Sequence, residues 1–344
     1  MQSNNNVIIA AAGSHKTQSI IQAVIDADPN EQILITTYTN ENLSQITNRI
    51  VSALGSIPPN VTVMSWFSFL LRDCIKPYQN FLTSTNKVRS LNFQTKPHRF
   101  AKKSEPVGYY IDSGENLYSD NVSDFAVSIN AASGGKTISR LEKIYKHIYV
   151  DEIQDLVGFD LDLLDLMMES QISITMVGDP RQSTYATSRT RRHKSYQGLG
   201  LTDWFIERQK KKICDIEWRT VSYRCNQSIC DFADNLYPAL PRTASKNLIP
   251  TGHDGVFTIT HAEVASYMSS YNPVVMRHSR SSNTLGYAAI NFGASKGNTY
   301  DRVLIFPTEP MKKYLKTKDL NKAGDISKFY VAVTCAKHSV VFVV

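Results

Sequence analysis

Short hydrophobic runs recur along the chain, and each ends in polar residues and is followed by a stretch with helical periodicity. In the first part of the chain these runs are VIIA before GSHKT, QILITTYTN before LSQITNRI, KHIYVDE before LDLLDLMME, and SITMVGD before PRQS. Strands that alternate with helices in this way are typical of βα units, which build parallel sheets. The pattern therefore predicts an α/β fold with parallel sheets and flanking helices.

A second set of hydrophobic runs indicates a second domain of the same kind. It comprises IEWRTVSYR before QSICDFADNLY, then NPVVMR, DRVLIF and the final SVVFVV. Between the two sets, residues 189–212 form a basic stretch that we interpret as the crossover. We expect a first domain at residues 1–200 and a second at 201–344. Residues 72–140 are polar with no strong period, which predicts an insertion into the first domain.

Composition narrows the class of protein. The chain has 344 residues, of which 42% are hydrophobic and 20% charged, as in soluble globular proteins of about two domains. The polar start MQSNNN and the lack of a long apolar run argue against a signal peptide or a membrane span. Five cysteines without a CxxC pair argue against a disulfide framework or a zinc site, so we expect a cytoplasmic protein. The net charge of +7 is compatible with a polyanionic partner.

The segment AAAGSHKT, at residues 10–17, directly follows the first hydrophobic run. A helix that begins after a glycine-containing turn offers its first backbone N–H groups to phosphate. Here Lys16 would reach the outer phosphates of a nucleotide, and Thr17 would bind Mg²⁺. The segment has one glycine, Gly13, and His15 precedes the lysine. Taken alone, a chance strand–helix turn is an equally good interpretation of it.

Two further strand ends carry residues suited to phosphoryl transfer. In HIYVDEIQDL, Asp151 could hold Mg²⁺ through water, and Glu152 could orient and deprotonate an attacking water. In MVGDPRQSTY, Gln182 is placed to sense a γ-phosphate. The alternative for the acidic pair is an exposed helix start, which the helix dipole favours. Three such strand ends in this order favour a nucleotide site.

Eight segments follow one another in the order of a known motif set. They are AAAGSHKT, TTYTN (36–40), SWFSF (65–69), DEIQD (151–155), GDPRQSTY (178–185), SYRCNQSICDFAD (222–234), ASKGNTYDRVLI (294–305) and FYVAVTCAKHSVV (329–341). In this order the chain resembles a superfamily-1 DNA helicase of the UvrD/Rep/PcrA type. The resemblance implies two RecA-like domains, with ATP and Mg²⁺ in the cleft between them and single-stranded DNA across the top. It also implies a minimal form, because the family's large insertion in the second domain is nearly absent.

The resemblance assigns roles to individual residues. Aromatic side chains at strand ends would stack on bases, although core packing is the alternative for Phe67 and the one we favour for Phe69. Basic residues at 189–194 would contact phosphates, or would form a solvated linker. The implied catalytic residues are Glu152, Gln182 and Arg224; the nucleotide contacts are Ala12, Gly13, Ser14, His15, Lys16, Thr17, Tyr223 and Gly297; the Mg²⁺ ligands are Thr17 and Asp151; and the DNA contacts are Thr37, Tyr38, Asn40, Trp66, Phe67, Tyr185, Arg191 and Ser295.

Several positions depart from the family pattern. His15 replaces a glycine, and it would either add a donor to the phosphates or shift the backbone. Thr299 stands where the family has a glutamate that contacts ribose, and only nine residues precede Ala10, where the family has a glutamine segment that reads adenine. Cys335 replaces an arginine, which leaves Arg224 as the recognisable arginine finger of the second domain. We therefore expect few base contacts and a slow ATPase.

Two functions remain open at this point. The first is an ATP-dependent single-stranded DNA translocase or helicase, with 3′→5′ polarity implied by the family type, from a bacterium, phage or other virus. The second is a nucleotide- and DNA-binding subunit of a larger complex, for instance with a nuclease, that uses ATP as a conformational ligand. DNA-stimulated phosphate release would distinguish them.

Overall fold

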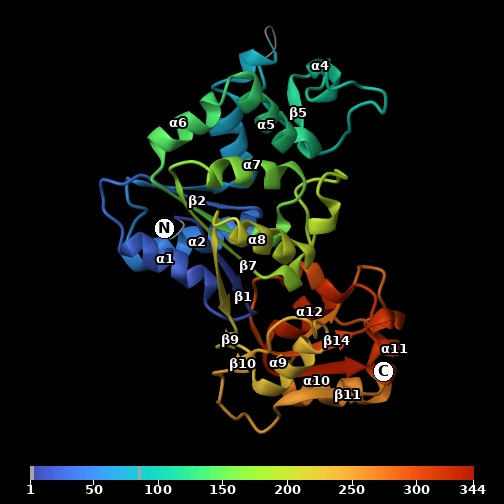
Figure 1. Cartoon of the computed structure of the whole chain (residues 1–344). Helices are drawn as coiled ribbons and strands as arrows, with labels where there is room; N and C mark the ends of the chain where they lie inside the picture. The colour runs from blue at the N-terminus through green and yellow to red at the C-terminus, as the bar shows by residue number, and fades with distance from the viewer. Residues whose placement is uncertain (1–3, 84–86) are drawn as a thin grey trace. The chain divides into compact units, whose positions relative to one another are not determined.

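The computed structural model describes residues 4–83 and 87–344, and the chain divides into two compact units (Figure 1). Unit 1 comprises the chain up to Ile8, then Thr17–Gly178 and Tyr185–Glu217. Unit 2 comprises Ile9–Lys16, Asp179–Thr184 and Trp218–Val344. Unit 1 thus extends to Glu217 rather than ending near residue 200, and two short segments from the first half of the chain group with unit 2.

The core of unit 1 is a six-stranded sheet. Its pairs β2–β3, β2–β6 and β6–β7 are parallel, and every side chain of β2 is buried. Helix α2 shows why the local sequence is helical: the Thr39 side chain caps its first turn, Ile46 and Ile50 recur at helical spacing on its buried side, and Gly55 ends it in a left-handed conformation. The strand order is β3 (Val61–Ser65), β2 (Ile33–Thr37), β6 (His147–Asp151), β7 (Ser173–Gly178), β1 (Asn6–Ala10), β8 (Asp215–Arg219), and the helices are α1 (Lys16–Ile25), α2 (Asn40–Leu54), α7 (Phe159–Met168) and α8 (Gly200–Lys210).

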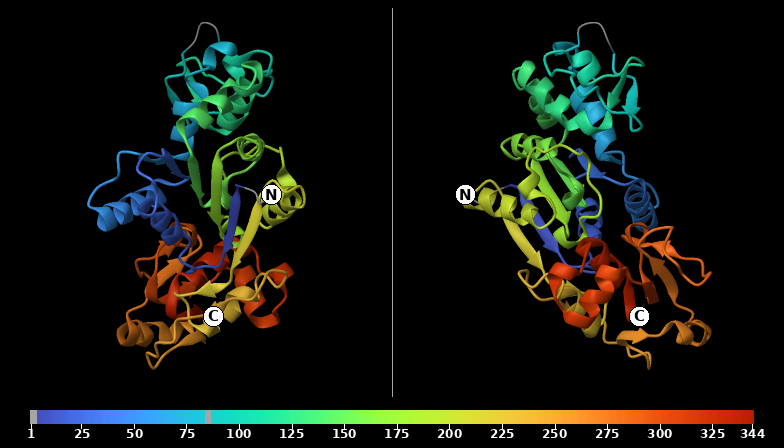
Figure 2. Two further views of the ribbon diagram at one scale, coloured as in Figure 1. Left: turned by 60° about the vertical axis from the view of Figure 1, so that its left-hand side comes forward. Right: turned by 90° about the vertical axis from the view of Figure 1, so that its right-hand side faces the viewer.

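The insertion of unit 1 folds as a small cluster at one end of that unit (Figures 1 and 2). Phe125, Ile129 and Leu141 from its two longest helices are fully buried, together with Tyr110. The segment therefore has its own core, although its sequence lacks a strong period. Helix α3 (Trp66–Phe69) and a π-helical turn (Leu70–Ile75) lead into it from β3. Its elements are β4 (Ser90–Asn92), α4 (Pro106–Tyr109), β5 (Asn116–Tyr118), α5 (Val122–Ala132) and α6 (Lys136–Ile144), which ends just beyond it.

The core of unit 2 is a five-stranded sheet in which all four strand pairs are parallel. Side chains alternate along β15 (Ala336–Val343), an interior strand: Val340 and Phe342 join one hydrophobic cluster, and Val341 and Val343 join the other. Both faces of the sheet are therefore covered, as expected for parallel strands. The strand order is β11 (Gly255–Ile259), β15 (Ala336–Val343), β14 (Tyr300–Phe306), β12 (Val274–Arg277), β13 (Ile290–Asn291). A separate two-stranded sheet pairs β9 (Val221–Ser222) with β10 (Ala244–Ser245). The helices are α9 (Gln227–Asp234), α10 (Val264–Tyr271), α11 (Glu309–Thr317) and α12 (Ile326–Thr334).

The predicted α/β class, with parallel sheets and flanking helices, is confirmed. The assignment of one strand was wrong: β8, which the sequence grouped with the second domain, is the edge strand beside β1 in the six-stranded sheet. The backbone N–H of Asp215, at the start of β8, donates to the carbonyl of Asn5 at 2.9 Å. In the described part of the chain, none of the helices combines the length and the apolar character that crossing a bilayer would require.

Candidate nucleotide site and DNA-facing residues

The predicted phosphate loop joins β1 to α1, and the helix begins at Lys16. Gly13 has φ +77°, and a Cβ atom there would lie 2.5 Å from Cβ of Arg224 and 2.8 Å from Oγ of Ser222. Glycine is therefore required at this position for its backbone conformation and for space. The backbone N–H of Ser14 donates to the carbonyl of Ala11 at 3.2 Å, which closes the turn.

Within unit 2 the loop is held by residues that follow β9 and by α12. The Tyr223 N–H donates to the Gly13 carbonyl at 2.9 Å, and the Ala12 N–H donates to the Tyr330 hydroxyl at 3.4 Å. The His15 imidazole stacks on the Tyr223 ring, with centroids 4.4 Å apart and planes 8° from parallel. His15 has φ +59°, which is unusual for a residue with a side chain. The loop is thus pinned by a ring stack and two hydrogen bonds.

Thr17 and Asp151 lie together in unit 1. Asp151 is the last residue of β6 and is buried, and its Oδ2 lies 3.4 Å from the Thr17 hydroxyl, which donates to it. A hydroxyl and a carboxylate are oxygen ligands of the kind that Mg²⁺ prefers, and protein sites for this ion use few side chains. These two residues therefore fit the predicted metal role.

Glu152 follows directly and has a strained backbone. Its φ of +55° lies in the left-handed region, and its N–H donates to Oδ1 of Asp151 at 3.0 Å. Its carboxylate accepts a hydrogen bond from the Gln154 side-chain amide, and both side chains are buried. Non-glycine residues in this conformation cluster at functional sites, where surrounding contacts hold them. The turn after β6 thus fixes a carboxylate beside the Thr17–Asp151 pair.

Residues 179–184 form a buried polar network within unit 2. Oδ1 of Asp179 accepts from the Arg181 guanidinium at 2.7 Å, and Oδ2 accepts from the Gln182 amide and the Tyr330 hydroxyl, both at 3.1 Å. Arg181 also lies 3.5 Å from Asp234, and these carboxylates raise the pKa of its guanidinium against the opposing effect of burial. Gln182 is therefore present at the predicted strand end, with its amide held by Asp179.

Arg224 and Cys335 lie close together in unit 2. The Arg224 guanidinium donates to the Thr334 carbonyl at 3.2 Å. The Cys335 thiol is buried 3.1 Å from the carbonyl of Ser295, and burial raises its pKa to about 11. The thiol is therefore neutral near pH 7 and supplies no positive charge at this position. Gly297 is exposed in a turn with φ +82°.

Several predicted DNA contacts form one surface feature of unit 1. The rings of Tyr185 and Tyr38 have centroids 6.5 Å apart, and Tyr38 and Phe67 are 5.8 Å apart. The Tyr38 hydroxyl donates to the Ala186 carbonyl at 3.3 Å, and partial burial raises its pKa. Tyr185 is 41% exposed, and Asn40, the first residue of α2, is exposed, as is Arg191 on another segment.

Three predicted DNA contacts need correction. Trp66 has no exposed surface, because its ring is enclosed in the core and its indole N–H donates to Asp160 at 2.7 Å. Thr37 is likewise buried at the end of β2, and Ser295 is buried with its hydroxyl bonded to the Phe292 carbonyl at 2.8 Å. A side chain without accessible surface offers nothing to a nucleotide base or phosphate, so we remove these three from the DNA-facing set.

The sequence did not reveal the role of Asp160. This buried carboxylate accepts hydrogen bonds from Trp66, from the hydroxyls of Ser123 and Thr187, and from the Val157 N–H. Its donors come from four separate parts of unit 1. One of them, Ser123, belongs to the insertion, so Asp160 connects the insertion to the rest of the unit by a hydrogen bond. The donors are not part of one local sequence motif, so the network is visible in the three-dimensional structure and not in the sequence.

Part of the basic stretch at 189–194 is engaged within the protein. Arg192 and His193 both lie against Asp162 of α7, at 2.5 and 3.1 Å. These contacts keep the pKa of Asp162 below its usual value despite partial burial. For the other basic residues of that stretch, the phosphate-contacting role stays a prediction.

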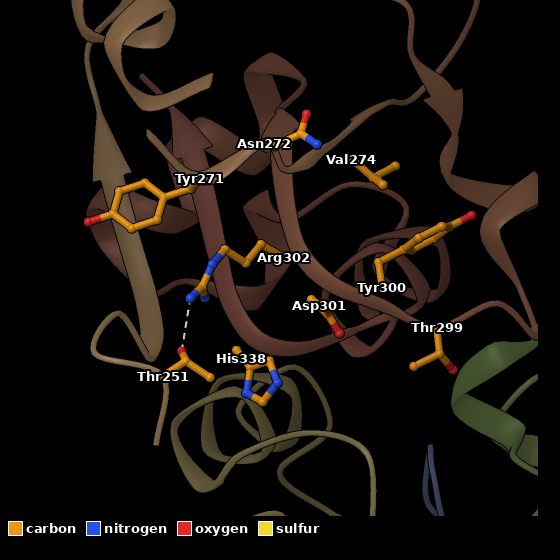
Figure 3. Close-up of a pocket in the computed structure, with 9 residues that line it drawn as sticks. All are labelled: Thr251, Tyr271, Asn272, Val274, Thr299, Tyr300, Asp301, Arg302 and His338. Atoms are coloured by element: carbon orange, nitrogen blue, oxygen red, sulfur yellow. Dashed lines mark hydrogen bonds between the residues drawn. The ribbon is translucent and has the colours of Figure 1, made fainter. Parts of the chain in front are cut away.

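Unit 2 also contains a polar pocket of about 570 Å³ that the sequence did not indicate (Figure 3). Arg302 reaches across it, and its guanidinium donates to the Thr251 hydroxyl at 2.9 Å. Thr299, the position of the family's ribose-contacting glutamate, lies on the wall of this pocket and not in its centre (Figure 3). The other lining residues are Tyr271, Asn272, Val274, Tyr300, Asp301 and His338.

Comparisons with known proteins find similarity to helicases. Residues 71–192 match the family model of the UvrD/REP helicase N-terminal domain. The ATP-dependent DNA helicase SRS2 of Saccharomyces cerevisiae is 34% identical over 99 residues, which cover 26% of this chain and 7% of the yeast protein. Two solved structures of arterivirus nonstructural protein 10, a helicase, alone and with DNA, give TM-scores of 0.49 and 0.48 at 14% identity; the match covers 99% of this chain and 59% and 61% of theirs. The chain therefore spans only part of the length of these relatives.

Proposed function

We propose that the chain is a UvrD/Rep-like superfamily-1 helicase, an ATP-dependent translocase or helicase on single-stranded DNA with 3′→5′ polarity; the match of residues 71–192 to the UvrD/REP helicase N-terminal domain supports this. The observation that carries the proposal is the arrangement of Thr17, Asp151 and Glu152 in unit 1. A hydroxyl, a buried carboxylate and a second carboxylate fixed by a strained backbone follow one another at the end of β6 and the start of α1. Metal ligands and a residue that orients the attacking water are recurring parts of enzymes that transfer phosphoryl groups to water.

Each residue has a separate task in this proposal. Thr17 and Asp151 would hold Mg²⁺, which neutralises charge on the phosphate oxygens when bound. Glu152 orients the attacking water and accepts its proton, and Gln154 holds the Glu152 carboxylate in place. Lys16 binds the outer phosphates, and Gln182 responds to the γ-phosphate.

Two residues of unit 2 also have tasks in the proposal. Arg224 stabilises the charge that develops on the transferring phosphate, and Tyr223, which is 51% exposed, offers its ring to the base. Single-stranded DNA lies on unit 1 along Tyr38 and Tyr185, where exposed ring faces accept bases of any identity. All five cysteines are free and buried thiols, which suits the reducing cytoplasm that we propose as its location.

A second function is favoured by two features of unit 2. The neutral Cys335 thiol stands where the family has an arginine, and the His15 ring already occupies a face of Tyr223. The missing positive charge would slow turnover, and the occupied ring face would reduce contacts with the base. A chain that binds ATP mainly as a conformational ligand, as a subunit beside a nuclease, would have the same features.

The test is phosphate release by the full chain with Mg²⁺-ATP, measured with and without single-stranded DNA. We expect DNA to stimulate release at least tenfold and Lys16→Ala to abolish it. Lys143→Ala, on the exposed side of α6, is the matched control and should leave the rate unchanged. Tight ATP binding with no stimulated turnover would reject the motor in favour of the subunit.

A further inference from the structure

The insertion of unit 1 carries an exposed aromatic ring that continues the predicted DNA surface. The Phe93 ring lies 5.6 Å from Phe67, centroid to centroid, and Phe67 in turn lies 5.8 Å from Tyr38. Phe67 is only 8% exposed and joins its neighbours, whereas Phe93 is 65% exposed. Tyr185, Tyr38, Phe67 and Phe93 therefore form one continuous series of rings, which we call the ring series.

The segment that carries Phe93 is strongly basic. Residues 87–103 contain six lysines and arginines and no aspartate or glutamate, and all six basic side chains are exposed. Two of them pair with acids elsewhere in the insertion, Arg89 with Glu115 and Lys103 with Asp124, each at 2.5 Å. Four basic side chains thus remain to attract a polyanion: Lys87, Lys96, Arg99 and Lys102.

The fold holds Phe93 in place. Strand β4, which ends at Asn92, pairs in parallel with β5. The Asn92 side-chain oxygen then accepts from the backbone N–H groups of Gln94 and Thr95, at 2.9 and 3.0 Å, so the chain turns sharply around Phe93. Upstream, Val88 is buried and its N–H donates to Gln79 at 2.7 Å. A ring fixed in this way loses little freedom on binding.

Exposed rings beside basic side chains are the combination that binds single strands without sequence preference. The rings stack on bases, and the cations contact phosphates. A single exposed phenylalanine would need no explanation. Here the exposed ring extends a series that already faces the predicted DNA path, and the surrounding charge has one sign. A protein partner for this surface would have to be both acidic and apolar.

We propose that residues 87–103 are a single-stranded DNA-binding segment, which extends the DNA path of unit 1 from Tyr38 onto the insertion through Phe93. The proposal rests on the proposed function, since it adds to the same path. The extended path engages strands that are long enough to reach the insertion. Shorter strands bind at Tyr38 and Tyr185 alone.

The test measures binding of oligothymidines of about 2 and about 16 nucleotides to the full chain by fluorescence anisotropy. Neighbouring bases are about 3.4 Å or more apart, so the long strand alone spans the ring-to-ring steps from Tyr185 to Phe93. Phe93→Ala should weaken binding of the long strand about 5- to 150-fold, the effect expected for loss of one base stack, and should leave the short strand unchanged. Phe81→Ala is the matched control. That ring is 46% exposed in the same insertion but lies outside the ring series, so both strands should bind as in the wild type.

Charge provides a second, independent measurement. The quantity measured is the slope of the logarithm of the binding constant against the logarithm of salt concentration. Replacing Lys96, Arg99 and Lys102 together by alanine should reduce the magnitude of this slope by about 2 for the long strand, since each single-strand phosphate contact contributes about 0.7. The matched triple variant at Lys312, Lys313 and Lys316, on α11, should leave the slope unchanged.

The outcomes separate this proposal from the function on which it rests. If Tyr38→Ala weakens both strands while Phe93→Ala weakens neither, the extension is wrong and the DNA path of unit 1 stands. If Phe93→Ala weakens both strands equally, the extension is also wrong. If the wild-type chain binds neither strand, the proposed function itself fails.

Discussion

Replacing His15 should change nucleotide affinity, because its side chain covers the ring that we assign to the base. In unit 2 the His15 imidazole lies nearly parallel to Tyr223, with centroids 4.4 Å apart. An aromatic pair of this kind stabilises the stacked state by about 0.5–1.5 kcal/mol beyond area burial. A base that stacks on the same face of Tyr223 must first displace the imidazole. Its removal should therefore tighten ATP binding by about 2- to 12-fold.

Two variants separate the ring from the backbone. His15→Ala removes the imidazole but keeps a side chain at φ +59°, whereas His15→Gly also relieves a backbone conformation that disfavours side chains by about 1–2 kcal/mol. We expect both variants to bind ATP more tightly than the wild type. His15→Phe, which retains a stacking ring, is the matched control and should bind no more tightly.

The assay is titration of each protein with a fluorescent ATP analogue, with Mg²⁺ and without DNA. Tyr223→Ala completes the comparison, since it should weaken binding and abolish the gain from His15→Ala. Weaker binding by His15→Ala in the wild-type background would refute the reasoning, because it would mean that the imidazole donates to the phosphates instead of competing with the base.

Two further predictions concern burial. Tyr38→Ala should weaken single-stranded DNA binding by about 1–3 kcal/mol, measured by anisotropy, and should lower the melting temperature much less than Trp66→Ala does. Trp66→Ala should destabilise the fold by about 3–5 kcal/mol, measured by thermal unfolding, because it empties a core site and removes one of the donors to Asp160; the reverse pattern would mean that Trp66 faces the DNA. The native Cys335 thiol should resist alkylation at pH 8, because burial raises its pKa to about 11 and the reactive thiolate forms only as the pH approaches that value. Mass spectrometry after timed iodoacetamide treatment measures this, with the unfolded chain as control. Rapid labelling of the native protein would contradict the prediction.

Local pattern predicted the strand ends and the helix starts well. Asp151 ends β6, Gly178 ends β7, and α1 begins at Lys16, as the hydrophobic runs and their polar endings indicated. These features depend on residues a few positions apart, so the sequence contains them directly. The same holds for the parallel sheets, which follow from the alternation of strands and helices.

What the sequence missed depends on distant contacts. In the sequence, Trp66 is an aromatic residue at a strand end. In the structure it is buried, because it donates to Asp160, which is distant in sequence and also binds Ser123. The stack of His15 on Tyr223 and the ring contact of Phe67 with Phe93 likewise join separated segments. The sequence analysis misplaced the edge strand β8 for the same reason: its neighbour in the sheet, β1, is at the start of the chain and far from β8 in sequence.

Glu152→Gln tests the central claim most directly. The substitution removes the proton acceptor but retains the size of the side chain and the residues that bind phosphate. Phosphate release in the presence of saturating single-stranded DNA should fall by at least 100-fold, while ATP affinity stays within about twofold of the wild type. The matched control, Glu169→Gln at the exposed end of α7, should retain the full rate. Wild-type turnover by Glu152→Gln would contradict the account, because the carboxylate after β6 would then have no part in hydrolysis.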